Sequence, residues 1–536
     1  MAIAGEPSIV THNPSGDYAK SIIYPVGVPK MMGNSLTTSG LRRSVALQPL
    51  KSGQGGPAKP GPDADHPISI YLLVTLLVLH IALAWVEKGR PWLVHLHGLA
   101  ALGLVLTFGT NPRHPERAVQ AVAYLCGIEV FWRMCSRSGA VFWEFNKYAS
   151  VLVLLVALLR RGRFRHFLLP LLYFALLLPA AGLTFAHEDW GDARQSLGGN
   201  LSGPLLVAVG FAFMSQLALT RQQLSKTLLC YIIPLVGVAF LCYSGTFGAV
   251  EIEFGTRSNK AASGGLAPNQ VSAALGFGIL SVLICLLLAR GRLQLQGLLL
   301  LLALWFAIQS GLTFSRTGLY LAGLCSLVGM MPLLRTPRLR WTVIGVTMAL
   351  VILAYFVIVP ALNRFTQGAF SERFQSTNLT NRDLIWKADL EIWLSHPLFG
   401  VGVGLSDEFR SARVAEEVRA HTEYTRLLAD HGLLGLASLT VLLACVVGAY
   451  RKTQSDFERA FCLAMTTFGL LFMAASATRL AVFALALGMA SVRIGRAPPV
   501  APSVPAGRPA YRRLVPRAAT GSGFRRLPRP RRLPTC

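Results

Sequence analysis

Residues 68–86 read ISIYLLVTLLVLHIALAWV, a run without Asp, Glu, Lys or Arg. As an α-helix, this run would be roughly 28 Å long, close to the thickness of the hydrocarbon core of a bilayer. Inside lipid, a helix satisfies all of its own backbone hydrogen bonds, whereas an open loop or a sheet edge does not. The stretch therefore predicts a membrane-spanning helix.

Similar apolar runs recur along the chain of 536 residues, which is 53% hydrophobic and only 14% charged. Soluble domains carry about one quarter charged residues, so this composition argues against a soluble protein. We predict an all-α, polytopic integral membrane protein with about 12–14 transmembrane helices. The fourth expected span is short, and the last two could form one broken unit. The expected spans are 68–86, 92–109, 118–134, 148–160, 166–184, 201–219, 227–245, 270–289, 294–313, 315–333, 341–360, 433–449, 459–476 and 479–495.

The charges between the spans predict the orientation of the chain. Basic residues follow the fourth, eighth, tenth and twelfth spans, in segments 160–165, 290–292, 335–340 and 451–452. If the spans alternate in direction, these four segments share one side, which the positive-inside rule assigns to the cytoplasm. Both termini are then cytoplasmic, and the long segment 361–432 lies outside.

This reading divides the chain into five parts. A tail, 1–66, is rich in Gly, Pro and Ser and lacks the apolar region of a signal peptide, so the first span is expected to direct insertion. A transmembrane bundle, 67–360, leads into the large loop 361–432, and C-terminal helices follow at 433–496. The tail 497–536 has nine Arg, nine Pro and no acid, which predicts disorder. Contact with anionic lipid headgroups is favoured over nucleic acid as its role.

The outer loop contains NRDLIWKADLEIWLSH at 381–396, which predicts a helix opened by a capping box at Thr380 and Asp383. Four of its side chains fall on one helical face: Arg382, Trp386, Asp389 and Trp393. Such a stripe is typical of a helix at the membrane surface with its indoles at headgroup depth. A lid helix packed on the bundle is the alternative, and both can hold at once.

Two further loop stretches follow. HPLFGVGVGLSDEF, residues 396–409, has glycines at alternate positions, which favours a tight structural turn over a phosphate cradle. AHTEYTRLLADHGLLG, residues 420–435, predicts a helix from His421 to Asp430 that Gly432 ends. The histidine spacing does not fit a helical zinc site, and the nine cysteines include no C-x-x-C pair, so no metal site and no cofactor are predicted.

Tyr424 lies on the His421 face of this expected helix. His431, in its last turn, reads as a structural residue that completes the helix.

Three arginines outside this loop are candidates for function. Arg316, in GLTFSRTGLY at 311–320, lies between two spans, where a charge is costly to bury. Its alternative role is snorkelling to the interface. Arg257, in an outer loop at 254–270, could bind anionic or sugar groups or could belong to a hydrated loop. Arg194, in HEDWGDARQS at 187–196, is a similar case.

The order of these features resembles the O-antigen ligase/polymerase superfamily. The resemblance rests on SRTG (315–318), NRDLIW (381–386), HPLFGVGVG (396–404) and H-x-x-Y-x-x-L-L-A-x-x-G-L-L-G (421–435). It is strong over 310–440, loose over the earlier spans and absent in both tails. Members of this family are polytopic glycosyltransferases of the bacterial inner membrane with one large periplasmic loop. They move glycan from a polyprenyl diphosphate carrier to an acceptor sugar.

The resemblance implies roles for individual residues. His421 matches the loop histidine, the general base for the acceptor hydroxyl, while Arg382 and Arg316 match the family's two arginines. Arginine forks neutralise a diphosphate without a metal, and a neutral imidazole can take the acceptor's proton. Trp386 could hold the loop helix at the depth of the carrier's diphosphate. One departure is Thr422, where the family usually has Asn.

We therefore expect a metal-independent, inverting glycosyltransferase that acts on the periplasmic face. A polymerase would use another lipid-linked glycan as acceptor, a ligase would use the lipid A core, and a protein O-glycan transferase is a third version. The rival from another class is a transporter or flippase of lipid-linked glycans. Because no duplication of halves is visible and the notable polar residues gather outside, the enzyme is favoured.

Overall fold

The computed structural model describes residues 68–136, 143–162, 167–248, 254–255, 257–376, 382–414, 420–476 and 479–495. The two predicted tails and the expected capping box at Thr380 lie outside these residues.

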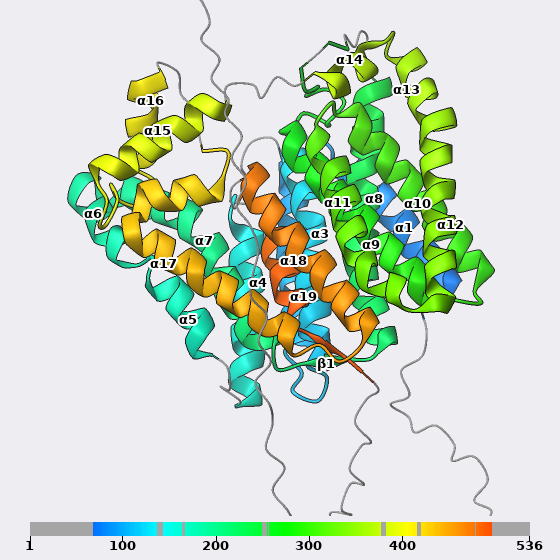
Figure 1. Ribbon diagram of the computed structural model, residues 1–536, viewed down its shortest axis with the longest axis horizontal. Helices are drawn as coiled ribbons and strands as arrows, with labels where there is room; N and C mark the ends of the chain where they lie inside the picture. The colour runs from blue at the N-terminus through cyan, green and yellow to red at the C-terminus, as the bar shows by residue number, and fades with distance from the viewer. Residues whose placement is uncertain are drawn as a thin grey trace, which may run out of the picture. The chain divides into compact units, whose positions relative to one another are not determined.

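The described chain is helical almost throughout (Figure 1). The helices of its first half are α1 (Ile70–Glu87), α2 (Pro91–Gly109), α3 (Glu116–Ser136), α4 (Phe145–Arg161), α5 (Leu168–Ala175), α6 (Pro179–His187), α7 (Trp190–Met214) and α8 (Arg221–Phe247). Those that follow are α9 (Pro268–Leu288), α10 (Leu293–Leu312), α11 (Arg316–Met330), η1 (Met331–Arg335), α12 (Pro337–Leu353), η2 (Ala354–Ile358), α13 (Val359–Phe365), α14 (Ala369–Gln375), α15 (Arg382–Ser395), α16 (Ser406–Val414), α17 (Glu423–Arg451), α18 (Asp456–Ser476) and α19 (Val482–Ala490). A parallel pair of two-residue strands joins β1 (Ala218–Leu219) to β2 (Arg493–Ile494).

Among the described residues, 12 helical segments are long and apolar enough to cross a membrane. The fold is that of an all-α polytopic membrane protein, as the hydropathy pattern predicts. Some spans are built from several pieces. The span 168–187 comprises α5 and α6, which meet at Pro179, and the span 343–365 contains the π-helical turn η2.

The last expected span, 479–495, contains a single helix, α19, of nine residues, followed by the short strand β2. At 1.5 Å per residue, this helix is less than half as long as a bilayer core is thick. α18 and α19 pack against each other as one broken unit, the arrangement that the sequence left open. Every residue of α19 is buried.

Burial varies strongly between the candidate membrane-spanning helices, although all of these are apolar. In α3, 94% of the most apolar stretch is buried, against 6% in the span 343–365. α3 packs mainly on α8, and α9 packs on α10 and α11. Of these helices, α3, α8 and α9 are mostly buried and form the interior of the bundle. The exposed leucines and aromatic residues of α1, α2 and α12 suit contact with lipid.

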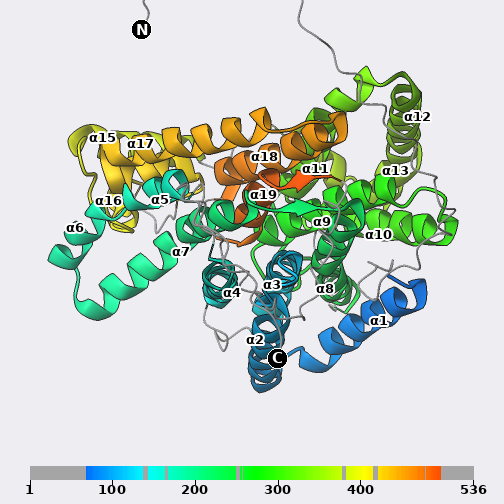
Figure 2. The ribbon, with the colours of Figure 1, turned by 90° about the horizontal axis from the view of Figure 1, so that it is seen from below.

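Residues 382–431 form a small helical unit, which we call the cap. It comprises α15, α16 and the first part of α17, and Figures 1 and 2 both show these helices side by side. The cap has its own apolar cluster of Ile392, Val401, Leu405 and Ala429, separate from the main core. It contacts the spans through α17, which packs along α5.

Candidate active site

The first turn of α17 determines where His421 lies. The helix begins at Glu423, two residues later than the sequence indicates, and Thr422 is its N-cap. The Thr422 hydroxyl accepts a hydrogen bond from the backbone N–H of Tyr424 over 3.2 Å. Both Thr and Asn are good N-cap residues. The departure from the family pattern at position 422 therefore keeps the capping role, and it leaves His421 just outside the helix.

The glycine-rich stretch 396–409 contacts α17 at a break in that helix. Gly432 has φ 60° and ψ −138°, so the helix is interrupted there, as the sequence predicts. The carbonyls of Ala429 and Asp430 just before the break accept hydrogen bonds from the N–H groups of Val401 and Gly402, at 3.0 and 3.1 Å. These two N–H groups are therefore occupied within the fold. The glycine stretch serves as the structural turn that the sequence favours over a phosphate cradle.

Buried ion pairs fix the three cap helices to one another. Asp389 of α15 and Arg410 of α16 are both completely buried, with Arg410 Nε 2.8 Å from Asp389 Oδ1. Thr425 of α17 donates its hydroxyl to the other carboxylate oxygen of Asp389 at 2.6 Å. Within α17, Arg426 pairs with Glu423 and Asp430. Because breaking a buried pair costs several kcal/mol, these contacts hold the cap in one geometry.

Asp389 and Trp386 differ in burial although they are three positions apart on α15. Asp389 lies on the buried face of α15, whereas Trp386 is 39% exposed. α15 therefore packs as a lid helix through Asp389, and Trp386 stays available to a surface or ligand.

Three arginines gather beside the cap. Arg316 begins α11 and donates to the carbonyl of Ser376, while Arg373 of α14 donates from Nε to the carbonyl of Phe314 at 3.0 Å. Burial and the charge of Arg316 lower the pKa of Arg382. Burial, Arg316 and Arg382 together lower the pKa of Arg373. Mutual repulsion of this kind is relieved when an anion binds between the guanidinium groups.

The turn that carries Arg316 is held by close packing. Ser272 of α9 accepts a hydrogen bond from the Gly318 N–H at 2.9 Å and donates to the carbonyl of Ser315 at 2.9 Å. Phe314, two residues before Arg316, is fully buried and has φ 56°, a strained conformation for a bulky residue. Strain of this kind persists only where the surroundings enforce it, and it is common at functional sites.

Positively charged side chains also act on His421. Burial lowers its pKa to about 4, and Arg382, Arg479 and Arg410 act in the same direction. The imidazole is thus neutral at ordinary pH. Its Nδ1 is buried and has no hydrogen-bond partner among the described residues. A neutral ring with an unused nitrogen is suited to take a proton from a ligand.

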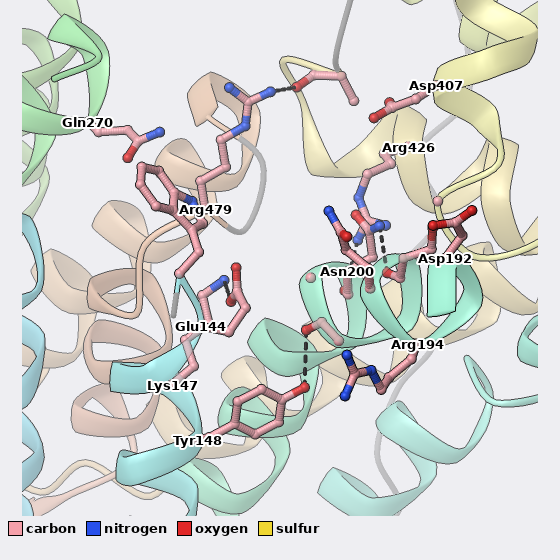
Figure 3. Close-up of a pocket in the computed structure, with 17 residues that line it drawn as sticks. Glu144, Lys147, Tyr148, Asp192, Arg194, Asn200, Gln270, Asp407, Arg426 and Arg479 are labelled. Atoms are coloured by element: carbon pink, nitrogen blue, oxygen red, sulfur yellow. Dashed lines mark hydrogen bonds and ion pairs between the residues drawn. The ribbon is translucent and has the colours of Figure 1, made fainter. Parts of the chain in front are cut away.

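A cavity of about 1160 Å³ opens next to His421, with Ala420 in its wall (Figure 3). Arg479 lies at this edge and donates from Nη2 to the carbonyl of Ala420 at 2.9 Å. The lining combines aromatic rings, amides, hydroxyls and charges of both signs. The lining residues are Trp143, Glu144, Lys147, Tyr148, Asp192, Arg194, Gln195, Ser196, Gly198, Gly199, Asn200, Gln270, Gly404, Asp407, Ala420, Arg426 and Arg479.

The predicted site residues fall into two groups. The charge of Arg382 lowers the pKa of His421, and the charge of Arg316 lowers the pKa of Arg382. Arg194 lines the cavity from α7. Arg257, Tyr424 and Trp386 are not among the residues that line the cavity.

Arg257 is exposed on the loop after α8, where its neighbour Asn259 donates its N–H to the carbonyl of Thr313 at 2.9 Å. The Tyr424 hydroxyl donates to the carbonyl of Leu470 at 2.9 Å, so it ties α17 to α18. His431 is fully buried and is not part of the cavity lining, as expected of a structural residue.

Several charged residues of the site were not singled out from the sequence. Arg479 follows α18, and Glu129 and Arg133 pair within α3, where both are buried. The signal for this pair was present, because two opposite charges four residues apart in an apolar span are costly unless they have a role. No comparable local pattern marks Arg479. Among the described residues, no three His, Cys, Asp or Glu side chains gather as they would around a metal ion.

Residues 276–440 match the family model for O-antigen ligase. The match supports the resemblance of this part of the chain to the O-antigen ligase/polymerase superfamily. The match runs from α9 through Arg316, the arginine cluster and the cap into α17. The match supports, in general terms, glycan transfer at a membrane by an enzyme of the glycosyltransferase kind. No curated protein matches the chain.

Proposed function

We propose that this protein transfers glycan from a polyprenyl diphosphate carrier to the hydroxyl of an acceptor sugar, on the periplasmic face of the bacterial inner membrane. The observation that carries the proposal is that Arg382 acts electrostatically on His421, while Ala420, the residue before it, lies in the wall of the large cavity. The donor diphosphate binds at Arg316, Arg373 and Arg382. The acceptor glycan lies in the cavity.

The arginine group fits a diphosphate because it presents several fixed cations to one anion. Each guanidinium can bind two phosphate oxygens, and it does so without a metal ion. When the bond from the anomeric carbon to the diphosphate oxygen breaks, the electron pair stays on that oxygen. The arginines stabilise the charge that develops there, so the carrier diphosphate becomes a good leaving group.

The acceptor hydroxyl attacks the anomeric carbon from the opposite side, which inverts its configuration. The new carbon–oxygen bond forms as the old one breaks, and the hydroxyl proton passes to the imidazole of His421. A base with a pKa of about 4 is weak, so we expect this proton to move late, once bond formation has made the hydroxyl acidic. The same low pKa lets His421 release the proton to water and regain its neutral form.

The cavity suits a saccharide in its chemistry. Trp143 and Tyr148 offer ring faces, and Asn200 and Gln270 offer amide donors and acceptors beside the charged groups. Arg426 in the wall is held by Glu423 and by the carbonyl of Asn200, so this part of the cavity is rigid. The acceptor is a growing surface glycan or the lipid A core.

The test is a transfer assay with purified protein in lipid nanodiscs and a polyprenyl diphosphate oligosaccharide. Chain growth on the donor alone identifies a polymerase, and transfer only after addition of lipid A core identifies a ligase. We expect His421→Ala to lower turnover by about 10²–10⁴-fold, the usual contribution of a general base. His396→Ala is the matched control, because His396 is an exposed cap histidine that does not line the cavity.

Two outcomes would contradict the proposal. Full activity of both His421→Ala and Arg316→Ala would remove the assigned machinery. Loss of turnover in EDTA, with recovery on adding a divalent cation, would refute the metal-independent mechanism.

A further inference from the structure

Arg479 lies in the short connection between α18 and α19, and a buried ion pair of α3 holds its backbone. The carbonyl of Arg479 accepts a hydrogen bond from Nη1 of Arg133 at 3.0 Å. Two residues on, the N–H of Ala481 donates to Oε2 of Glu129 at 2.7 Å. Glu129 is 1% exposed and Arg133 is 7% exposed. The connection is therefore anchored inside the bundle.

Arg133 joins further segments to this anchor. It donates to the side chain of Gln270 at 3.2 Å and to the carbonyl of Trp143 at 2.8 Å. Its guanidinium also lies 4.4 Å from the ring centre of Trp143. Gln270 and Trp143 both line the cavity. A charged pair inside an apolar bundle is costly, so its use at a point where four segments meet indicates a role in geometry.

The side chain of Arg479 extends from this anchor to the cap. It reaches the carbonyl of Ala420, the residue directly before His421, and it forms part of the cavity wall (Figure 3). Ala420 and His421 lie just outside α17, which begins at Glu423. Arg479 thus supplies a fixed contact between the bundle and the backbone beside His421.

The charged groups that act on His421 come from three elements. They are Arg382 in α15, Arg410 in α16 and Arg479. Arg410 is already engaged by the buried carboxylate of Asp389, and Glu423, the acid nearest in sequence, pairs with Arg426. Arg382 belongs to the arginine group that we assign to the donor. Arg479 is the cation among these three that comes from the bundle and not from the cap.

We propose that Arg479 is a positioning residue for His421, fixing the Ala420–His421 backbone at the cavity edge and keeping a permanent positive charge beside the imidazole. The Glu129–Arg133 pair holds Arg479 in place for both tasks. This inference rests on the proposed function for its meaning in catalysis. The effect of Arg479 on the titration of His421 can be measured without any turnover.

The test measures how fast diethyl pyrocarbonate modifies His421 as a function of pH, followed by mass spectrometry of the peptide that contains it. This reagent reacts with the neutral imidazole. Arg479→Gln can still donate to the Ala420 carbonyl but lacks the charge, whereas Arg479→Lys keeps the charge. We expect the glutamine variant to raise the pH midpoint of His421 modification by on the order of half a pH unit or more, which is the effect of one nearby like charge. The lysine variant stays near the wild type.

Arg459→Gln serves as the matched control, because Arg459 lies in the first turn of α18, is 36% exposed and pairs with Asp456. Its midpoint should equal that of the wild type. In the transfer assay, the acid limb of the pH profile should move up with the midpoint in Arg479→Gln. A merely structural role would lower the rate without moving this limb.

Arg479→Ala provides a second arm, since added guanidinium ions can occupy the space of the lost side chain and bring the midpoint back down. A folded glutamine or alanine variant with the wild-type midpoint would overturn the proposal. So would failure of both neutral variants to fold, because Arg479 would then serve folding alone. If the midpoint shifts but the wild-type protein transfers no glycan, the proposed function fails and the positioning role stands.

Discussion

Replacing Asp389 by alanine is the sharpest test of how the cap is held together. Asp389 is fully buried and joins all three cap helices, through Arg410 of α16 and the hydroxyl of Thr425 in α17. Breaking a buried ion pair by removing one partner costs about 3–5 kcal/mol. Arg410 retains a second contact with Asp407, whose side chain is 45% exposed. We therefore expect the lower end of that range, about 3 kcal/mol.

A loss of this size raises the population of the opened cap by roughly 10²-fold, since each 1.4 kcal/mol is a factor of ten. The assay is limited proteolysis in detergent micelles at low protease concentration, where the cleavage rate follows the opened population. Asp407→Ala is the matched control. It removes the half-exposed partner of the same arginine and should cost no more than about 1 kcal/mol. Equal cleavage rates for the two variants, or an increase below tenfold for Asp389→Ala, would refute the reasoning.

Three more predictions concern single positions. Thr422→Ala should cost about 1 kcal/mol of cap stability through loss of the N-cap, whereas Thr422→Asn should be neutral; hydrogen exchange of the first turn of α17 measures both. Gly400→Ala should destabilise the cap by about 1–3 kcal/mol from its φ of 70° alone, and further because the new Cβ would lie 2.3 Å from the Asp430 carbonyl carbon. Gly297→Ala, in an open helical position, is its control in thermal unfolding and should be neutral or slightly stabilising. The pKa of His421, about 4 in the free protein, lies below the usual 6.5, so kcat/KM should fall as the pH drops through about 4. Because a bound diphosphate offsets the arginine charges, the acid limb of kcat should lie at higher pH; identical limbs would argue against donor binding at this cluster.

The spans could be predicted because hydropathy is a local property. Each apolar run, such as 68–86, becomes a helix wherever it packs, and only the details differ. The break between α5 and α6 depends on packing, so it escaped prediction, while a broken unit at α18 and α19 was left open as one of two alternatives. For the same reason, α17 begins at Glu423, after its N-cap Thr422, and does not include His421.

The site could be predicted only in part. His421, Arg382 and Arg316 carry a family pattern that is visible along the chain. The partnership of Arg479 with the turn before His421 joins residues 59 positions apart, and no spacing rule connects them. The Asp389–Arg410 pair likewise depends on how α16 folds back on α15. Residues of this kind become visible only in three dimensions.

The cap has a further consequence for how proteins of this architecture diversify. It has an apolar cluster of its own and a buried ion pair of its own, and neither uses side chains of the spanning bundle. Substitutions on its cavity-facing surface can therefore accumulate without weakening the helices that cross the membrane. Exchanging cap 382–431 between relatives should change which acceptor is used, while Arg316 and Arg373 of the proposed donor site stay with the recipient and Arg382 comes with the new cap.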